Sequence, residues 1–363
     1  MKRAAAVLAL LAVMVLISAA LLEVGVRLIL GPQVRFPRRV VGAPFGLRIN
    51  EPHARYHHQS PDVSVEFRIN GQGMREDRDV PYEKPAGTKR IVSLGDSFTV
   101  GYEVEGDETF ASVLERALAV RGIPVEVLNA GVSGYSTAEE ALYLERELYK
   151  YSPDLVLISY YGNDLVDNAR AGLFRLEGDQ LVETATTYVP GGGLGDFLNT
   201  NPIANYLSEH SDAFVTVKEV ATRLWKQRAI DENLGQIRGA EQVGVGTDPF
   251  AVEQQRLCAA IFERIYRGTR ERGIPLVIQS IPTPIYPDGT DGRVVLVEMF
   301  PLAEFDVARP GLLFFPAKSV LDPAVGRERL YHLRSHGHWT PYSHRVDGEA
   351  LAKKIVEAGL LTR

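Results

Sequence analysis

The chain has 363 residues, of which 45% are apolar and 24% are charged. This is the composition of a folded globular protein, and it excludes a disordered or collagen-like chain. The formal net charge is −6, and an acidic protein is not expected to bind nucleic acid, which requires a basic face. The single cysteine, Cys258, excludes an intramolecular disulfide and any zinc site built from several cysteines.

Residues 1–31 form a segment of different character. Lys2 and Arg3 precede an uncharged run over residues 4–22, which as a helix rising about 1.5 Å per residue spans a bilayer core. A cleaved signal peptide is the alternative. We favour an uncleaved single-pass anchor, because the apolar run exceeds a typical signal core and continues as a helix-compatible segment. The positive flank predicts that the chain after residue 31 lies across the membrane from its start.

Residues 32–88 are rich in proline, arginine and histidine and have few long apolar runs. We interpret them as a linker followed by a small β-rich preamble, with one strand at residues 65–69. Within this segment, His57 and His58 are interpreted as a solvated or interfacial pair.

From residue 89 to 363, short apolar runs alternate with helical patterns. The predicted strands are residues 90–94, 125–128, 155–160, 274–278 and 312–315. The predicted helices are a segment from Phe110 to Gly122, one that begins at a Ser136/Glu139 capping box, and residues 252–272 and 343–358. Cys258 lies on the apolar face of the third of these and is predicted to be a core residue. Strands separated by helices predict an α/β fold with a parallel, doubly wound sheet.

Residues 170–248 interrupt this alternation and are interpreted as an insertion in the 89–363 domain. Residues 173–183 predict a β-hairpin, and a helix is expected over about 213–227. This insertion is a candidate to shape a substrate cleft.

Polar clusters follow the first three predicted strands, at the sheet edge where parallel α/β proteins form their sites. They are residues 95–97, 129–134 and 162–164, and a fourth cluster at residues 336–341 precedes the last helix. A serine, a histidine, an asparagine amide and glycine N–H groups are the parts that acyl transfer needs. Each cluster alone is a common turn or packing pattern, so the prediction depends on all four occurring in this order.

These clusters resemble the sequence blocks of the SGNH hydrolases, also called GDSL esterases. Residues 92–99 resemble the first block, in which Asp96 precedes the nucleophile Ser97. Residues 129–137 resemble the second, whose oxyanion glycine corresponds to Gly134 better than to Gly131.

The third and last blocks complete the resemblance, which covers about residues 65–358. Residues 162–164 make Asn163 the side-chain oxyanion donor, and residues 338–341 make His338 the general base. The family implies a three-layer α/β/α sandwich with a flavodoxin-like parallel sheet and no metal or organic cofactor. Residues 69–75 and the anchor resemble a bacterial envelope branch, in which relatives modify acetyl groups on exported polysaccharides. That branch implies a single-pass bacterial membrane protein with an extracytoplasmic catalytic domain.

One position departs from the family pattern. The family has an aspartate shortly before the histidine, whereas this chain has His336 there. The aspartate orients the base, so three alternatives arise. Another acid such as Asp322 or Glu328 reaches His338, His336 itself orients His338 in a weaker dyad, or the protein is slow or inactive and binds glycans.

The carboxy-terminal histidines also raise a metal hypothesis. His332, His336, His338 and His344 lie within 13 residues. We disfavour a metal site there, since no carboxylate or cysteine accompanies these histidines. His344 is a second candidate base, although at the start of a helix it is expected to cap the helix or face solvent.

The sequence thus predicts a serine esterase that hydrolyses an O-acyl ester, expected to be O-acetyl, of a glycan or small molecule through an acyl-Ser97 intermediate. An O-acyltransferase on an envelope polysaccharide is the close alternative, because it uses the same residues. A catalytically weak carbohydrate-binding protein is the other. The expected partners are the ester substrate, for which an acylated polysaccharide is a candidate, and the membrane, with no nucleic acid.

Overall fold

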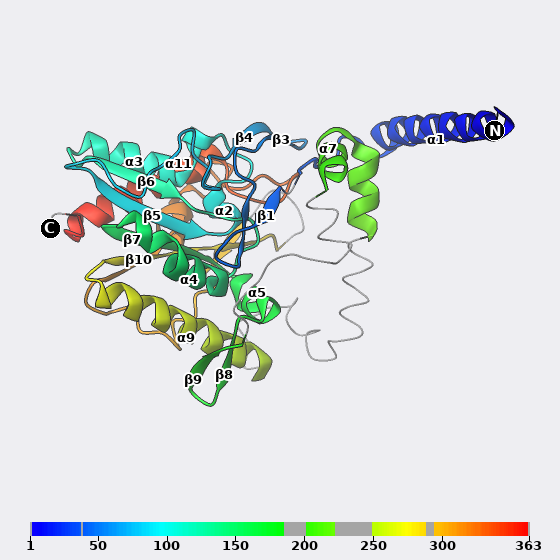
Figure 1. Cartoon of the computed structure of the whole chain (residues 1–363). Helices are drawn as coiled ribbons and strands as arrows, with labels where there is room; N and C mark the ends of the chain where they lie inside the picture. The colour runs from blue at the N-terminus through cyan, green and yellow to red at the C-terminus, as the bar shows by residue number, and fades with distance from the viewer. Residues whose placement is uncertain (1, 38, 185–200, 222–248, 288–293, 362–363) are drawn as a thin grey trace.

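The computed structural model describes residues 2–37, 39–184, 201–221, 249–287 and 294–361. A five-stranded parallel sheet forms the centre of the molecule (Figure 1). Its strands in spatial order are β13 (Leu312–Pro316), β10 (Leu276–Ile281), β7 (Leu155–Tyr161), β5 (Lys89–Gly95) and β6 (Val125–Asn129). Numbered along the chain this is the order 2-1-3-4-5 of flavodoxin-like sheets. The predicted fold class is confirmed, and each predicted strand is present within two residues at its start.

Helices cover both faces of the sheet, because its strands are apolar on both sides. Ile91 belongs to a core shared with α3 (Phe110–Val120) and α11 (Pro341–Glu357). Its neighbour Val92 belongs to the opposite core, shared with α4 (Thr137–Arg146), α5 (Asp164–Ala171) and α9 (Pro249–Glu271). Figure 1 shows these two helical layers on either side of the strands. The predicted three-layer sandwich is therefore present.

Local signals set several helix ends, of which the capping box at α4 was predicted, whereas α11 begins two residues before its expected start at 343. Ser136 and Glu139 form a reciprocal capping box at the start of α4. Thr340 caps α11, which has Pro341 in its first turn. Cys258 is fully buried in α9, as predicted for a core residue.

The segment 32–88 folds onto the domain rather than trailing from it. It contains two antiparallel pairs, β1 (Val40–Gly42) with β2 (Arg48–Asn50) and β3 (Arg55–Gln59) with β4 (Ser64–Arg68). The predicted strand at 65–69 is thus β4, displaced by one residue. Residues of this second pair share a small core with Val100 and Tyr102, which follow β5 in the chain. The preamble is therefore placed beside the carboxyl end of β5.

Short elements complete the described chain. They are α2 (Ser97–Val100), η1 (Gly106–Glu108), η2 (Leu148–Tyr151), β8 (Phe174–Glu177), β9 (Gln180–Glu183), α7 (Pro202–His210), β11 (Thr283–Ile285), β12 (Val295–Val297), α10 (Lys318–Leu321) and η3 (Asp322–Ala324). The pair β8–β9 is the predicted hairpin. Residues 212–221 are helical, which agrees with part of the helix expected over 213–227; the rest lies outside the described residues. The cleft-shaping role of the insertion stays a prediction, since residues 185–200 and 222–248 also lie outside them.

The amino-terminal helix α1 (Lys2–Ile29) projects away from the body (Figure 1). Its most apolar 18-residue window has a mean hydropathy of 2.9 and buries none of its residues in the protein. By length and composition it is a candidate membrane span, and a signal sequence has the same properties.

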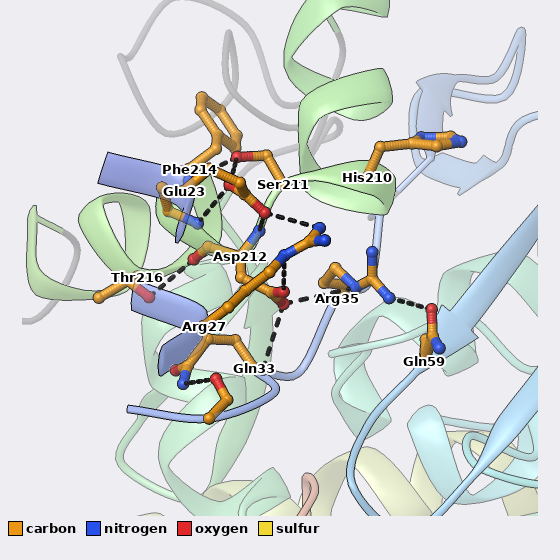
Figure 2. A network of polar contacts seen from close by, with 12 residues as sticks. Glu23, Arg27, Gln33, Arg35, Gln59, His210, Ser211, Asp212, Phe214 and Thr216 are labelled. Atoms are coloured by element: carbon orange, nitrogen blue, oxygen red, sulfur yellow. Dashed lines mark hydrogen bonds and ion pairs between the residues drawn. The ribbon is translucent and has the colours of Figure 1, made fainter. Parts of the chain in front are cut away.

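Polar contacts fasten the end of α1 to the insertion, as Figure 2 shows. Glu23 accepts hydrogen bonds from Ser211 Oγ at 2.7 Å and from the backbone amides of Asp212 and Ala213, both at 3.0 Å. Asp212 in turn pairs with Arg27 at 3.0 Å. Glu23 thereby satisfies amides at the start of the helical segment 212–221, which otherwise lack partners.

The contact between α3 and α11 gives a stability prediction. A Cβ atom on Gly348 would lie 2.7 Å from the Phe110 carbonyl oxygen and 2.8 Å from Val113 Cβ. We expect Gly348→Ala to lower the free energy of unfolding by about 1–2 kcal/mol, because overpacking outweighs the gain of about 1 kcal/mol that alanine normally brings to a helix. Chemical denaturation measures the difference.

The matched control is Gly268→Ala in α9, where the nearest atom is the flexible Tyr149 hydroxyl at 3.2 Å. This variant should be as stable as the parent or slightly more so. Equal stability of the two variants would contradict the packing argument.

Candidate active site

Ser97 lies directly beyond the carboxyl end of β5, which pairs with the middle strand β7, on a tight turn into α2. Gly95 has φ of +154°, and a Cβ atom there would lie 2.0 Å from Thr99 Oγ1. Asp96 caps α2, since its Oδ1 accepts the Phe98 amide at 2.8 Å. Burial raises the pKa of Asp96 to about 7, and the nearby Asp167 adds to the rise. The Gly-Asp-Ser order therefore has a structural reason: the glycine permits the turn and the aspartate caps the helix that presents the serine.

His338 meets Ser97 from the segment that precedes α11. Its Nε2 lies 2.7 Å from Ser97 Oγ, within hydrogen-bond distance. The backbone holds this segment in place, because the His332 amide donates to the His338 carbonyl at 2.9 Å. Burial holds the pKa of His338 well below its usual range, so the ring is neutral and able to accept a proton. The structure thus brings together the predicted nucleophile and base, which are 241 positions apart in the sequence.

A carboxylate approaches the other side of the His338 ring, and it belongs to Glu103. Glu103 Oε2 lies 3.9 Å from His338 Nδ1 and accepts the His338 backbone amide at 3.2 Å. The side chain of Glu103 is fully buried. Burial raises its pKa, opposed by hydrogen bonds from Ser335 and from the amides of His336 and His338. The order Ser97–His338–Glu103 is that of a nucleophile, a base and an orienting acid.

The backbone of Glu103 is held in an unusual conformation. Its φ is +71°, which is rare for a residue other than glycine and costs about 1–3 kcal/mol. Such a conformation persists only when its surroundings impose it. Here the loop over residues 100–104 is fixed by Arg75 of the preamble.

The guanidinium of Arg75 is buried and donates to backbone carbonyls on both sides of Glu103. It bonds to Val100 O at 2.7 Å, to Val104 O at 2.5 Å and to Gly101 O. The same group lies 3.8 Å from the centre of the Phe67 ring on β4. Desolvation lowers the pKa of Arg75 to about 10, which still leaves it charged at neutral pH. Arg75 therefore links the preamble to the loop that carries the acid.

The predicted oxyanion residues lie at the ends of neighbouring strands. Asn163 follows β7 and donates through Nδ2 to Asp167 Oδ2 at 3.1 Å, and it also bonds to the side chain of Asp96 next to the nucleophile. Gly134 has φ of +70°, and its carbonyl accepts a bond from Arg48 of the preamble. Gly131 packs against the nucleophile helix, where a Cβ atom would meet Val100 N at 2.3 Å. The oxyanion roles of Asn163 and Gly134 stay predictions.

His336, which stands where the family pattern has an aspartate, contacts Glu103 through both its backbone and its ring. Its amide donates to Glu103 Oε1 at 2.7 Å, and its ring nitrogen Nδ1 lies 3.7 Å from the same oxygen. His58 Nε2 also lies 3.7 Å from Glu103 Oε1. One carboxylate therefore faces His338 with one oxygen and two further histidines with the other.

Several expectations require correction. Among the described residues, Glu103 is the acid within 4 Å of the His338 ring, whereas Asp322 pairs with Lys318 on α10. His58 is fully buried, because alternate residues of β3 face inward, and only its neighbour His57 is exposed. His344 is also buried rather than solvent-facing.

Another histidine of the metal hypothesis, His344, has its ring bound elsewhere. His344 Nδ1 accepts the Phe110 amide at 3.1 Å, so it caps α3 instead of its own helix. Burial lowers the pKa of His344 to about 3. His332 is bound through its backbone to His338.

The residues that sequence reasoning missed are Glu103, Arg75 and His58. A weak signal existed for Glu103, a charged residue between the apolar Tyr102 and Val104 directly after the nucleophile helix. For His58, the signal was its placement two residues after Tyr56, on the same face of a strand.

Comparison with known proteins adds to this geometry. Residues 93–227 match the model of the GDSL-like Lipase/Acylhydrolase family. An arylesterase from Vibrio mimicus is 35% identical over 77 residues, which cover 21% of this chain and 38% of that protein. The chain therefore matches well under half the length of this curated relative.

Solved structures with a related fold have low sequence identity. A GDSL-like lipase from Bacteroides thetaiotaomicron is 13% identical, with 75% of this chain and 89% of that chain covered and a TM-score of 0.35. A family 3 carbohydrate esterase from Clostridium thermocellum is 11% identical, with 75% and 96% covered and a TM-score of 0.37. A lipase from a goat rumen metagenome is 14% identical, with 73% and 96% covered and a TM-score of 0.41.

The role of Arg75 predicts a large loss of stability on its removal. We expect Arg75→Met to lower the free energy of unfolding by at least about 2 kcal/mol, because each buried carbonyl left without a donor costs about 1–3 kcal/mol. Arg68→Met is the matched control, since Arg68 is half-exposed at the end of β4 in the same preamble and pairs with Glu66. Its effect should stay within about 0.5 kcal/mol. Equal losses in the two variants, measured by denaturation, would refute the role assigned to Arg75.

Proposed function

We propose that this chain, which belongs to the GDSL-like lipase/acylhydrolase family, is a membrane-anchored serine esterase. The observation that carries the proposal is the 2.7 Å contact between Ser97 Oγ and His338 Nε2 at the carboxyl end of the sheet. A neutral, buried imidazole in this position is able to take the hydroxyl proton as the serine attacks an ester carbonyl.

The reaction proceeds in two halves. Ser97 Oγ bonds to the carbonyl carbon, its proton passes to His338 Nε2, and the carbonyl oxygen becomes an oxyanion. The alcohol then leaves with the proton from His338, which forms the acyl-Ser97 ester. A water molecule repeats the sequence and releases the carboxylic acid. We assign stabilisation of the oxyanion to the Asn163 amide and the Gly134 backbone N–H, with each donor contributing about 10²–10³ in turnover.

Glu103 acts in this proposal as the positioning acid. When His338 takes the proton, its Nδ1–H faces Glu103 Oε2, and the negative charge stabilises the imidazolium. The 3.9 Å separation exceeds a hydrogen bond, and such contacts shorten when substrate is bound. The lack of an aspartate at position 336 left open whether another acid reaches His338 or the protein is weak or inactive. The position of Glu103 favours the first alternative and supports a working hydrolase.

The substrate we infer is an O-acyl ester, with acetylated glycans of the cell envelope as the narrower proposal. Two observations support it: helix α1, which fits a membrane anchor, and the arylesterase relative, whose name describes ester cleavage. An anchored body across the membrane from Lys2 and Arg3 has envelope polysaccharides within reach. Transfer of the acyl group to a sugar hydroxyl instead of water uses the same residues.

The nucleophile is tested with the full chain and its Ser97→Ala variant. We expect the parent to react with a fluorophosphonate probe and to hydrolyse p-nitrophenyl acetate, and the variant to do neither, because it lacks the attacking oxygen. Ser319→Ala, which changes an exposed serine on α10 outside the four polar clusters, is the control and should label normally. Absence of labelling in the parent would argue against a serine esterase.

Glu103→Gln tests the positioning acid, since it keeps the size of the side chain and removes its charge. We expect kcat to fall by about 10²–10⁴ with little change in KM, because only the imidazolium-forming step loses stabilisation. Glu105→Gln, two residues along the same loop, should leave kcat within a few-fold of the parent. If the two variants had equal kcat, another group would have to orient His338.

A further inference from the structure

We propose that His58, Glu103 and His336 form a binding site for a divalent transition-metal ion, with Zn²⁺ as the best-fitting ion, beside the Ser97–His338 dyad. One ligand atom from each of the three residues lies within 4.8 Å of the other two. Two imidazoles and one carboxylate are a ligand set that Zn²⁺ uses, with a fourth position left for water.

The two histidine–carboxylate distances need only a small closure to reach metal geometry, whereas the two histidine nitrogens lie within 4.8 Å of each other. His58 Nε2 and His336 Nδ1 each lie 3.7 Å from Glu103 Oε1. Two ligands of a tetrahedral zinc ion, each about 2.1 Å from it, are about 3.4 Å apart. At 3.7 Å neither ring nitrogen is hydrogen-bonded to that oxygen, so the spacing is too wide for a hydrogen bond and close to that of shared coordination.

Burial of His58 supports a ligand role. Its side chain is fully buried against the ring of Phe36, with ring centres 4.6 Å apart. Its Nε2 has a marginal 3.5 Å contact with Ser335 Oγ, and its Nδ1 has no partner among the described residues. Buried polar groups normally have good partners, and a cation on Nε2 would give this nitrogen a stronger partner than the 3.5 Å contact with Ser335.

The surroundings allow an ion to enter. The side chain of His336 is 42% exposed, so the site opens to solvent on that side and His336 is able to turn inward. Imidazole ligands favour zinc and similar first-row ions over Mg²⁺ or Ca²⁺, which prefer oxygen ligands. His336, which stands where the family pattern has an aspartate, thereby has a role as a metal ligand.

Metal binding would also affect the dyad. Glu103 faces the proposed ion through Oε1 and His338 through Oε2. An ion that draws the carboxylate toward itself competes with His338 for it, and bound Zn²⁺ should therefore slow ester hydrolysis. The effect on hydrolysis rests on the proposed function, whereas the binding site rests on its own geometry.

Calorimetric titration of the chelator-treated, detergent-solubilised full chain with Zn²⁺ tests the site. We expect one ion per chain and the same affinity in Ser97→Ala, which keeps all three ligands. His58→Ala and His336→Ala should each weaken binding at least tenfold. His57→Ala is the matched control, because His57 is the adjacent residue of β3 with a 60% exposed side chain on the other face. It should bind Zn²⁺ as the parent does.

Two results would overturn the site: no saturable Zn²⁺ binding by the parent, or equal affinity in the His336→Ala, His57→Ala and parent proteins. Circular dichroism checks each fold, and His336→Ala decides the matter if His58→Ala does not fold, since His336 is partly exposed. Hydrolysis by the parent without Zn²⁺ binding would reject the metal site alone. Zn²⁺ binding without hydrolysis or probe labelling would reject the proposed function alone.

Discussion

The buried guanidinium of Arg75 is the interaction on which the geometry of the site depends. A charged group out of water is costly unless it is hydrogen-bonded, and Arg75 donates from Nη1 and Nη2 to the carbonyls of residues 100, 101 and 104. Those carbonyls bracket Glu103 and hold it at a positive φ that it would not otherwise adopt. Because Arg75 belongs to the preamble, residues 32–88 are part of the active-site architecture rather than a tether.

Glu103 is a shared element between two groups of histidines. One oxygen lies toward His338 and the catalytic dyad, and the other lies toward His58 and His336. In the family pattern, an aspartate two positions before the histidine supplies the acid from the same segment. Here the acid that lies beside His338 is Glu103, from the loop after α2, and position 336 has a different residue type. The absence of an aspartate at position 336 is therefore matched by a carboxylate, Glu103, that reaches His338 from another segment.

The end of α1 is joined to the body by a similar principle. Glu23 accepts hydrogen bonds from Ser211 and from the start of the helical segment 212–221, and Asp212 pairs with Arg27 (Figure 2). A helix start exposes amides without partners, and a carboxylate from a distant segment satisfies them. The insertion thus contacts the region where the apolar helix ends, and this fixes the direction in which α1 leaves the domain.

The sequence by itself determined the fold class, the positions of the five strands along the chain and the four residues expected to carry acyl transfer. These features are local: apolar runs set the strands, the Ser136/Glu139 box starts α4, and Ser97, Asn163 and His338 stand in short blocks next to recognisable elements. The orienting acid was decided by tertiary structure alone. Glu103 is 235 residues from His338, and only the crossing of the loop after α2 with the segment before α11 brings them together. The burial of His58 likewise depends on which face of β3 packs inward, and the position of Tyr56 two residues earlier indicates that face only once the segment is known to be a strand.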